Sequence, residues 1–167
     1  MSEQIPIEAF RSGLLTVLEE VFEQVHGYVL DPGTSLFETL AMVSAAEASR
    51  PVFPGAGNLA AQVNHTRVYL DAFVTGLATG GAERPDWPGS WRVGPVDEEA
   101  WADLIAGLQA AYEQIRAFAG SFEGWDARFI GGAFALVAHS AYHLGEIRQG
   151  LGVLRASGPV EAARAGT

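Results

Sequence analysis

Two histidines stand four residues apart in the chain, at His139 and His143. On a helix this spacing places both side chains on one face with their Cβ atoms about 5–6 Å apart, so both imidazoles can ligate one metal ion at about 2.0–2.1 Å. Serine occupies position 140, where zinc peptidases of the H-E-x-x-H type require glutamate. The pair therefore indicates a metal site without indicating peptidase activity.

A third histidine, His65, lies on the apolar side of another helical stretch. At about 100° per residue, Arg67 and Asp71 fall on one side of that helix, and His65 and Tyr69 fall on the other. Three inward histidines on two helices indicate a three-histidine site, which leaves coordination positions open for water or substrate. The alternative is a set of ordinary core histidines, but buried neutral imidazoles need partners for both nitrogens, and this face offers no obvious partner except a metal.

Four aromatic residues accompany these histidines. Trp87 and Trp91 stand in a long connection, where they can cover the site as a lid or anchor the connection to the helices; we favour the anchor. Tyr69 and Tyr142 are close to the histidines in sequence, so either hydroxyl is a candidate contact for a bound water or substrate.

The remaining histidine and two serines carry less chemistry. His26 ends the first helical stretch beside Gly27, and we expect it to interact with the helix C-terminus or with solvent. Ser90 and Ser140 have no recognisable catalytic triad around them.

The composition excludes several classes of chemistry. The chain has no cysteine, so disulfides, thiolate zinc sites, iron–sulfur clusters and a cysteine nucleophile are ruled out. All ten basic residues are arginine, so Schiff-base chemistry and a P-loop lysine are also ruled out.

The charge and the apolar segments bear on partners and location. Twenty acidic residues against ten arginines give a formal charge of −10, which disfavours a nucleic-acid partner. The first six residues lack the basic and apolar regions of a signal peptide. The longest apolar run, Phe129 to Ala138, is far shorter than the roughly 18 residues of a membrane span. We expect a cytoplasmic protein with no membrane contact.

Four long stretches show the apolar periodicity of helices, which predicts an all-α four-helix bundle. With 49% apolar residues, a single domain over residues 1–156 can bury a core, and a loose tail follows over 157–167. The stretches run from Ile5 to His26, Asn58 to Leu77, Asp97 to Ala119 and Asp126 to Arg155, with Asp97 and Asp126 as N-caps and Gly27 and Gly120 as stop signals.

The connections predict the order of helix directions. The segment from Gly80 to Val96 is long enough to cross the whole bundle at about 3.3 Å per residue, so the second and third helices can run parallel. The third and fourth helices have a short connection and must be antiparallel neighbours. We therefore favour an up-down-down-up bundle.

The fourth helix is apolar on all sides, which a four-helix bundle does not explain. Its outer face carries Phe134, Val137, Ala141, Leu144 and Gly145. A homodimer contact is the simplest cover for this face, and we favour it. The alternative is cover by a short helix predicted over Ser35 to Ser49.

The pattern of histidines resembles the DinB/YfiT-like superfamily of proposed metalloenzymes. The similarity is carried by Ser35-Leu-Phe-Glu-Thr-Leu, by Gln62-Val-Asn-His65 and by the run from His139 through His143-Leu-Gly-Glu-Ile-Arg. It covers nearly the whole chain, from about Ile5 to Arg155.

This resemblance implies a four-helix bundle, often homodimeric, that holds one divalent metal ion (nickel, zinc or iron) on His65, His139 and His143. Some members transfer a low-molecular-weight thiol to a small-molecule substrate, and others resemble metal-dependent hydrolases or isomerases. Because this chain has no cysteine, any such thiol must be exogenous.

Glu146 departs from the family, which usually has glutamine after His-x-Gly. It lies on the face of the histidine pair and is our candidate catalytic residue. It can serve as a fourth ligand, as an acceptor that orients an imidazole, or as a general base. The alternative is an ion pair with Arg67 or Arg116. We expect the orienting or ion-pair role, because the family does not need a fourth protein ligand.

Three functional hypotheses follow. The first is a metal-dependent enzyme that activates water or an exogenous thiol as a nucleophile. The second is a non-catalytic dimeric protein that binds a metal or another ligand. The third is haem binding through paired histidines.

Overall fold

The computed structural model describes residues 5–79 and 84–158, and within those ranges the chain is helical, without strands. The predicted all-α class is therefore confirmed. The helices of the described ranges are α1 (Ile7–Phe22), α2 (Leu36–Leu40), α3 (Ala45–Ser49), α4 (Leu59–Thr79), α5 (Trp87–Ser90), α6 (Glu98–Ser121) and α7 (Ala127–Ala156).

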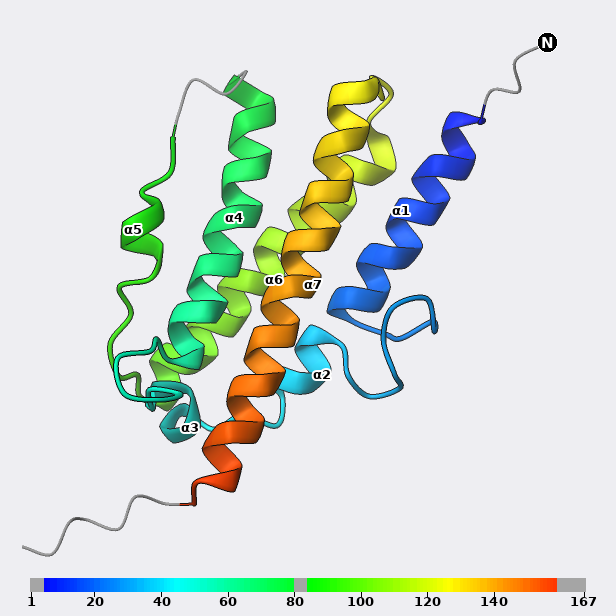
Figure 1. Ribbon diagram of the computed structural model, residues 1–167. Helices are drawn as coiled ribbons and strands as arrows, with labels where there is room; N and C mark the ends of the chain where they lie inside the picture. The colour runs from blue at the N-terminus through cyan, green and yellow to red at the C-terminus, as the bar shows by residue number, and fades with distance from the viewer. Residues whose placement is uncertain (1–4, 80–83, 159–167) are drawn as a thin grey trace, which may run out of the picture.

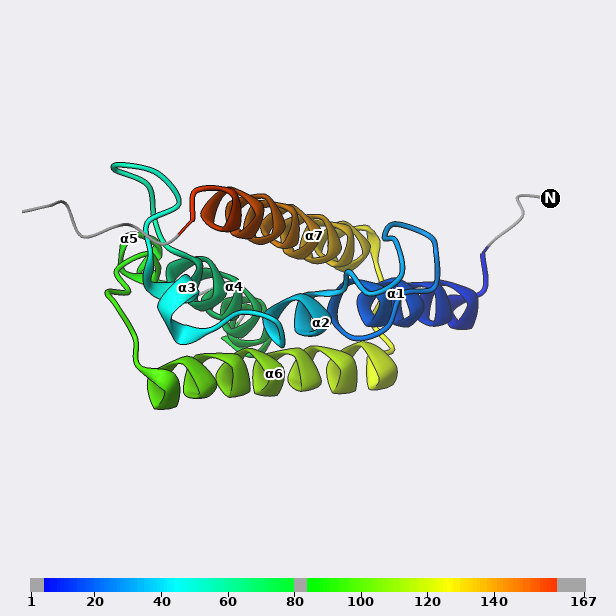
Figure 2. The ribbon, with the colours of Figure 1, turned by 90° about the horizontal axis from the view of Figure 1, so that it is seen from below.

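The four long helices form the bundle. Helix α4 packs against α6 and α7, and α1 packs against the same two helices. Figure 2 shows α6 and α7 on opposite sides, with α1 and α4 between them. In Figure 1, α1 and α7 run downward and α4 and α6 run upward, with the segment that contains α5 leading back to the lower end. An up-down-down-up bundle has these directions.

Local capping explains where α6 and α7 begin. The Asp97 carboxylate accepts a hydrogen bond from the Ala100 N–H at 2.8 Å, and the Asp126 carboxylate accepts from the N–H groups of the first turn of α7. Both predicted N-caps are confirmed. The stop predicted at Gly120 is wrong, because α6 continues through it to Ser121 and has no left-handed glycine at its end.

The end of α1 also differs from the prediction, because the helix stops at Phe22 rather than at His26. Glu20 is fully buried, and its carboxylate accepts hydrogen bonds from the backbone N–H groups of Tyr28, Val29 and Leu30 at 3.0, 2.7 and 2.8 Å. These bonds fold the following loop back onto the helix. Gly27, at φ 87°, supplies the left-handed residue that this reversal uses.

The short helix predicted over Ser35 to Ser49 is two helices, α2 and α3, because each has its own N-terminal signal. Ser35 pairs with Glu38, and Ser44 pairs with Glu47, in two successive capping boxes. The second box starts a new helix nine residues after the first.

The outer face of α7 is covered along only part of its length. Near its C-terminal end, Arg155 contacts Glu47 at 2.8 Å and the carbonyl of Met42 at 2.6 Å, so the α2–α3 segment lies against it. Toward its N-terminal end, an apolar groove of about 690 Å³ separates α7 from α1. Its lining residues are Ile5, Ala9, Phe10, Gly13, Leu14, Val17, Val29, Phe134, Val137, Ala138 and Ala141.

The groove is lined by three of the residues predicted on the outer face of α7, namely Phe134, Val137 and Ala141. Phe134 is 64% exposed. Leu144, predicted on the same face, is buried instead. The homodimer contact stays a prediction. Among the described residues, none of the helices combines the length and the apolar character that a bilayer crossing requires.

Two residues of the predicted C-terminal tail, Ser157 and Gly158, make contacts with the helical domain. Ser157 is the C-cap of α7, and the carbonyl of Gly158 accepts a hydrogen bond from Arg50 at 3.0 Å. The rest of the predicted tail, 159–167, lies outside the described residues, as do residues 80–83 of the long connection.

Replacement of the buried carboxylate in Glu20→Gln should lower the free energy of unfolding by about 1–3 kcal/mol, because the amide offers only one acceptor oxygen to the three backbone N–H groups that the carboxylate binds. Urea unfolding followed by circular dichroism at pH 7 measures the change. The matched control is Glu113→Gln on α6, a side chain 53% exposed, which should stay within about 0.5 kcal/mol of the wild type. Equal effects of the two substitutions would contradict the role of Glu20.

Candidate metal centre

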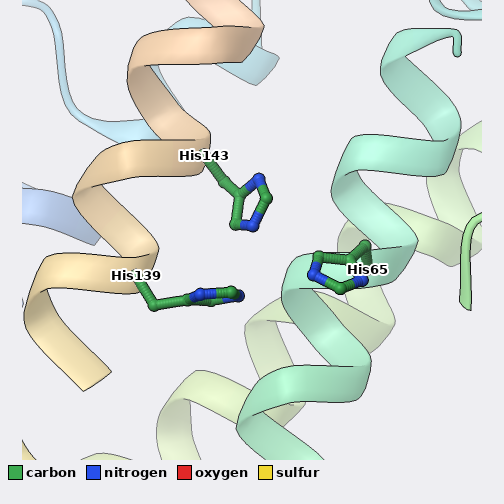
Figure 3. Close-up of side chains that lie close together, drawn as sticks. All are labelled: His65, His139 and His143. Atoms are coloured by element: carbon green, nitrogen blue, oxygen red, sulfur yellow. The ribbon is translucent and has the colours of Figure 1, made fainter. Parts of the chain in front are cut away.

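The three histidines meet where α4 and α7 lie side by side. One ligand atom from each of His65, His139 and His143 lies within 4.8 Å of the other two. Figure 3 shows the rings directed toward one shared space, one from α4 and two from α7. His65 and His143 are buried, and His139 is partly buried. The predicted grouping is confirmed, because the three side chains lie close enough to hold one metal ion.

Two glycines of α7 allow α4 to approach closely on both sides of the histidine pair. A Cβ atom at Gly132 would lie 3.2 Å from the Phe73 ring, and one at Gly150 would lie 3.0 Å from a methyl group of Leu59. Phe73 and Leu59 belong to α4, on either side of His65. A Cβ atom at either position would require the facing side chain to shift by a few tenths of an ångström, so the glycines suit the close packing of α7 against α4.

Hydrogen bonds determine the tautomer of His143. Its Nδ1 lies 2.8 Å from Gln62 Oε1 and 3.0 Å from Glu146 Oε2, and Gln62 Nε2 donates to the same carboxylate at 3.0 Å. Both neighbours of Nδ1 are acceptors, so Nδ1 carries the proton. Nε2 then presents its lone pair to the histidine cluster.

His65 has a comparable partner on a different element. Its Nδ1 lies 2.7 Å from Ser90 Oγ, at the last residue of α5. The ring of Trp91 stacks on the imidazole of His65, with the two ring centroids 4.0 Å apart.

The cluster contains buried nitrogens that the protein does not satisfy. The Nε2 atoms of His139 and His143 are both buried and have no hydrogen-bond partner within the described part of the chain. Leaving a buried polar atom unpaired costs about 1–3 kcal/mol. A cation that accepts lone pairs from both nitrogens would remove this cost, so the residues present fit a metal ion.

Burial favours the ligand form of all three side chains. Burial and the neighbouring charges of His143 and His65 lower the pKa of His139 to about 4. Burial also lowers the pKa of His65, helped by His143, and it lowers the pKa of His143 against the opposing effect of Glu146. The rings are therefore neutral at pH 7, the state in which imidazole binds metals.

Aromatic rings surround the histidines. Besides Trp91, the ring of Trp87 lies 5.9 Å from that of His65, and Tyr69 stacks on His139 at 3.6 Å. The two tryptophans anchor the connection to α4, as favoured above, and by the same contacts they cover one side of the cluster. Tyr142 lies 4.9 Å from His143 but its hydroxyl is occupied by Glu146, to which it donates at 2.7 Å.

The geometry does not fit haem binding through paired histidines. A haem with two axial histidines lies between their rings. Here the three imidazole centroids are only 4.4 to 5.5 Å apart, and each pair has the third ring beside it. No pair leaves room for a porphyrin plane.

Glu146 contacts the site through His143. Burial tends to raise the pKa of Glu146, but hydrogen bonds from Tyr142, Gln62 and His143 outweigh it, so the pKa lies below its usual range. The carboxylate is ionised, and both its oxygens accept hydrogen bonds. It binds the Nδ1 side of the ring, which is the position that an orienting acceptor needs.

The predicted ion pair of Glu146 with Arg67 or Arg116 is wrong. Arg67 pairs with Asp71 at 2.9 Å, one turn further along α4. Arg116 contacts Glu23 at 3.4 Å. Each arginine therefore pairs with an acidic residue other than Glu146. The side chains that contact Glu146 are those of His143, Gln62 and Tyr142.

Other predicted residues lie apart from the cluster or make no polar contact with it. His26 lies beyond the end of α1, and its Nε2 lies 2.8 Å from a carboxylate oxygen of Glu19. Ser140 is buried beside His139, and its hydroxyl has no hydrogen-bond partner within the described ranges.

Sequence reasoning missed two contacts of the centre. Gln62 lies one turn before His65, so a search for polar residues at helical spacing from a candidate ligand would have found it. Ser90 is 25 residues from His65 in a connection without periodicity, so no sequence signal places it there.

No protein-family model, no curated protein and no solved structure matches this chain. The similarity to the DinB/YfiT-like superfamily therefore stays a prediction. The function has to be inferred from the geometry of the centre.

The lowered pKa of the histidines predicts how the stability of the metal-free protein depends on pH. An unfolded chain binds protons on these rings below about pH 6.5, whereas the folded protein resists protonation of His139 until about pH 4. The free energy of unfolding should therefore be fully retained above pH 6.5 and should fall as the pH is lowered toward 4.

Urea unfolding at half-unit steps between pH 7.5 and 5, with a chelator present, measures this dependence. His139→Gln should show a shallower slope, because one of the shifted groups is gone. The matched control is His26→Gln, which removes a histidine outside the cluster. An identical slope for the wild type and His139→Gln would contradict the assignment.

Proposed function

We propose that this chain is a DinB/YfiT-like metalloprotein in which His65, His139 and His143 hold one divalent cation. The observation that carries the proposal is the pair of buried Nε2 atoms, on His139 and His143, which have no hydrogen-bond partner among the described residues. Three neutral imidazoles within 4.8 Å of one another supply a donor set that nickel, zinc and iron all accept.

The donor set also suits catalysis. A divalent cation acts as a Lewis acid that makes a bound water or thiol nucleophilic near neutral pH. The three imidazoles are uncharged donors, so they leave the charge of the cation undiminished. Three protein ligands leave coordination positions open.

The residues around the histidines would have distinct tasks. Glu146 and Gln62 hold His143 in one tautomer and one orientation, and this is the role we propose for Glu146 in place of a general base. Tyr69 stacks on His139, and its hydroxyl makes no hydrogen bond to another described residue, so it is available to a small substrate.

We propose transfer of a low-molecular-weight thiol as the leading activity, with hydrolysis of a small substrate as the second form of the same chemistry. Because the chain has no cysteine, the thiol is a co-substrate. The thiol releases its proton to solvent, its sulfur attacks an electrophilic carbon, and the carbon–sulfur bond forms as the bond from that carbon to the leaving group breaks, so that the leaving group departs with the electron pair of the broken bond. In hydrolysis, water takes the place of the thiol.

A second candidate is a non-catalytic dimeric protein that binds a metal or another ligand. Two observations favour it. His143 is only 2% exposed, which restricts access of a substrate to the centre, and the groove between α1 and α7 is almost wholly apolar.

Elemental analysis tests the metal. Protein purified without added metal should contain about one divalent ion per chain, and His65→Ala, His139→Ala and His143→Ala should each lose most of it, because two histidines alone form a weak site. The matched control, His26→Ala, should retain the ion. Metal retained in all three cluster variants would overturn the proposed site.

An activity assay separates the two candidates. With a low-molecular-weight thiol and the electrophile 1-chloro-2,4-dinitrobenzene, the metal-loaded protein should release chloride above the uncatalysed rate. Chelation should abolish the rate, and one metal should restore it. A protein that holds its metal tightly but turns over neither this electrophile, an epoxide nor an ester would favour the non-catalytic binder.

A further inference from the structure

The hydroxyl of Ser90 connects His65 to the backbone of α5. Ser90 Oγ lies 2.7 Å from His65 Nδ1 and 2.7 Å from the carbonyl oxygen of Trp87. Ser90 is 3% exposed, so bulk water does not compete for these contacts.

The direction of the two hydrogen bonds follows from the proton count. A carbonyl oxygen only accepts, so the single hydroxyl proton of Ser90 is donated to Trp87. The hydroxyl oxygen must then accept from His65, which requires the proton of that imidazole to be on Nδ1. The Nε2 atom of His65 is left with its lone pair.

Ser90 is itself held in place. The Asn64 amide donates to the carbonyl of Ser90 at 2.7 Å, and Asp86 caps α5 by accepting from the Gly89 N–H at 2.9 Å. Pro88 stands in the first turn of α5 and restricts its backbone. The hydroxyl is thus presented to His65 from a constrained turn.

We propose that Ser90 is a positioning residue of the metal centre, which fixes the tautomer and the orientation of His65 so that Nε2 faces the other two imidazoles. This inference rests on the proposed function for its metal, but the tautomer belongs to the metal-free protein. With this role for Ser90, α5 contributes a residue to the metal centre, in addition to α4 and α7, which carry the ligands.

The arrangement gives each oriented ligand its own partner. His143 is held by an amide and a carboxylate from α4 and α7, and His65 is held by a hydroxyl from α5. Without the hydroxyl, a proton on Nδ1 of His65 would have no acceptor, and the ring would rotate or move its proton to Nε2, the nitrogen that the metal needs.

Ser90→Ala is the direct test, and Ser140→Ala is its matched control. Both serines are buried near a cluster histidine, but the Ser140 hydroxyl has no partner among the residues described. With Zn²⁺ alone as the probe, chelator competition should show affinity lowered about 10–100-fold in Ser90→Ala, the range typical for loss of a residue that orients a ligand. Ser140→Ala should match the wild type, and Ser90→Thr, which keeps the hydroxyl, should regain most of the affinity.

The tautomer of His65 provides a second measurement, which would not change if Ser90 had only a structural role. Long-range ¹H–¹⁵N correlation spectra of the metal-free protein at pH 8 should show the Nδ1–H form for His65 in the wild type and in Ser140→Ala. In Ser90→Ala, the Nε2–H form should appear. Circular dichroism should confirm that every variant is folded.

Two results would overturn the positioning role: an Nε2–H form of His65 in the wild type, or the same tautomer and Zn²⁺ affinity in Ser90→Ala as in the wild type. Failure of the wild type to bind Zn²⁺, nickel or iron, with His65 still in the Nδ1–H form, would instead overturn the proposed function. The two ideas can therefore fail separately.

Discussion

The close approach of α4 and α7 is the constraint on which the candidate centre depends. It brings three imidazoles together, two of them buried and the third partly buried, and leaves two buried nitrogens without a hydrogen-bond partner among the described residues. A fold that served only to pack a core would satisfy or replace such groups, because each one is costly. The proposed cation would satisfy both nitrogens at once, because they lie in the same cluster.

The surroundings of the histidines are organised to keep this arrangement in one state. Glycines on α7 allow the close contact at both sides of the pair, hydrogen bonds to Nδ1 direct the protons of His65 and His143 away from the cluster, and stacked rings of Trp91 and Tyr69 limit rotation of the imidazoles. Burial keeps all three rings neutral. Each of these effects would prepare the side chains for the proposed cation before it is bound, which would lower the cost of binding.

The groove between α1 and α7 is a separate feature. It lies on the outer side of α7, where Phe134 and its neighbours remain exposed, whereas the α2–α3 segment reaches only the other end of that helix. The surroundings of the outer face of α7 thus differ along the length of the helix. One part packs against elements of the same chain, and the other part faces a groove lined by α1.

The sequence by itself determined the helices and the candidate ligands. The apolar periodicity located the four long helices, and aspartates marked the starts of two of them. The i, i+4 spacing of His139 and His143, with the position of His65 on the apolar side of α4, predicted three inward histidines. These are local properties, set by backbone geometry and by the side on which apolar residues recur. Only the tertiary structure decided the rest: the end of α1 depends on a buried carboxylate that folds the following loop back onto the helix, and Ser90 reaches His65 across 25 residues. Such contacts depend on how the chain is folded in space, and the spacing of residues along it carries no record of them.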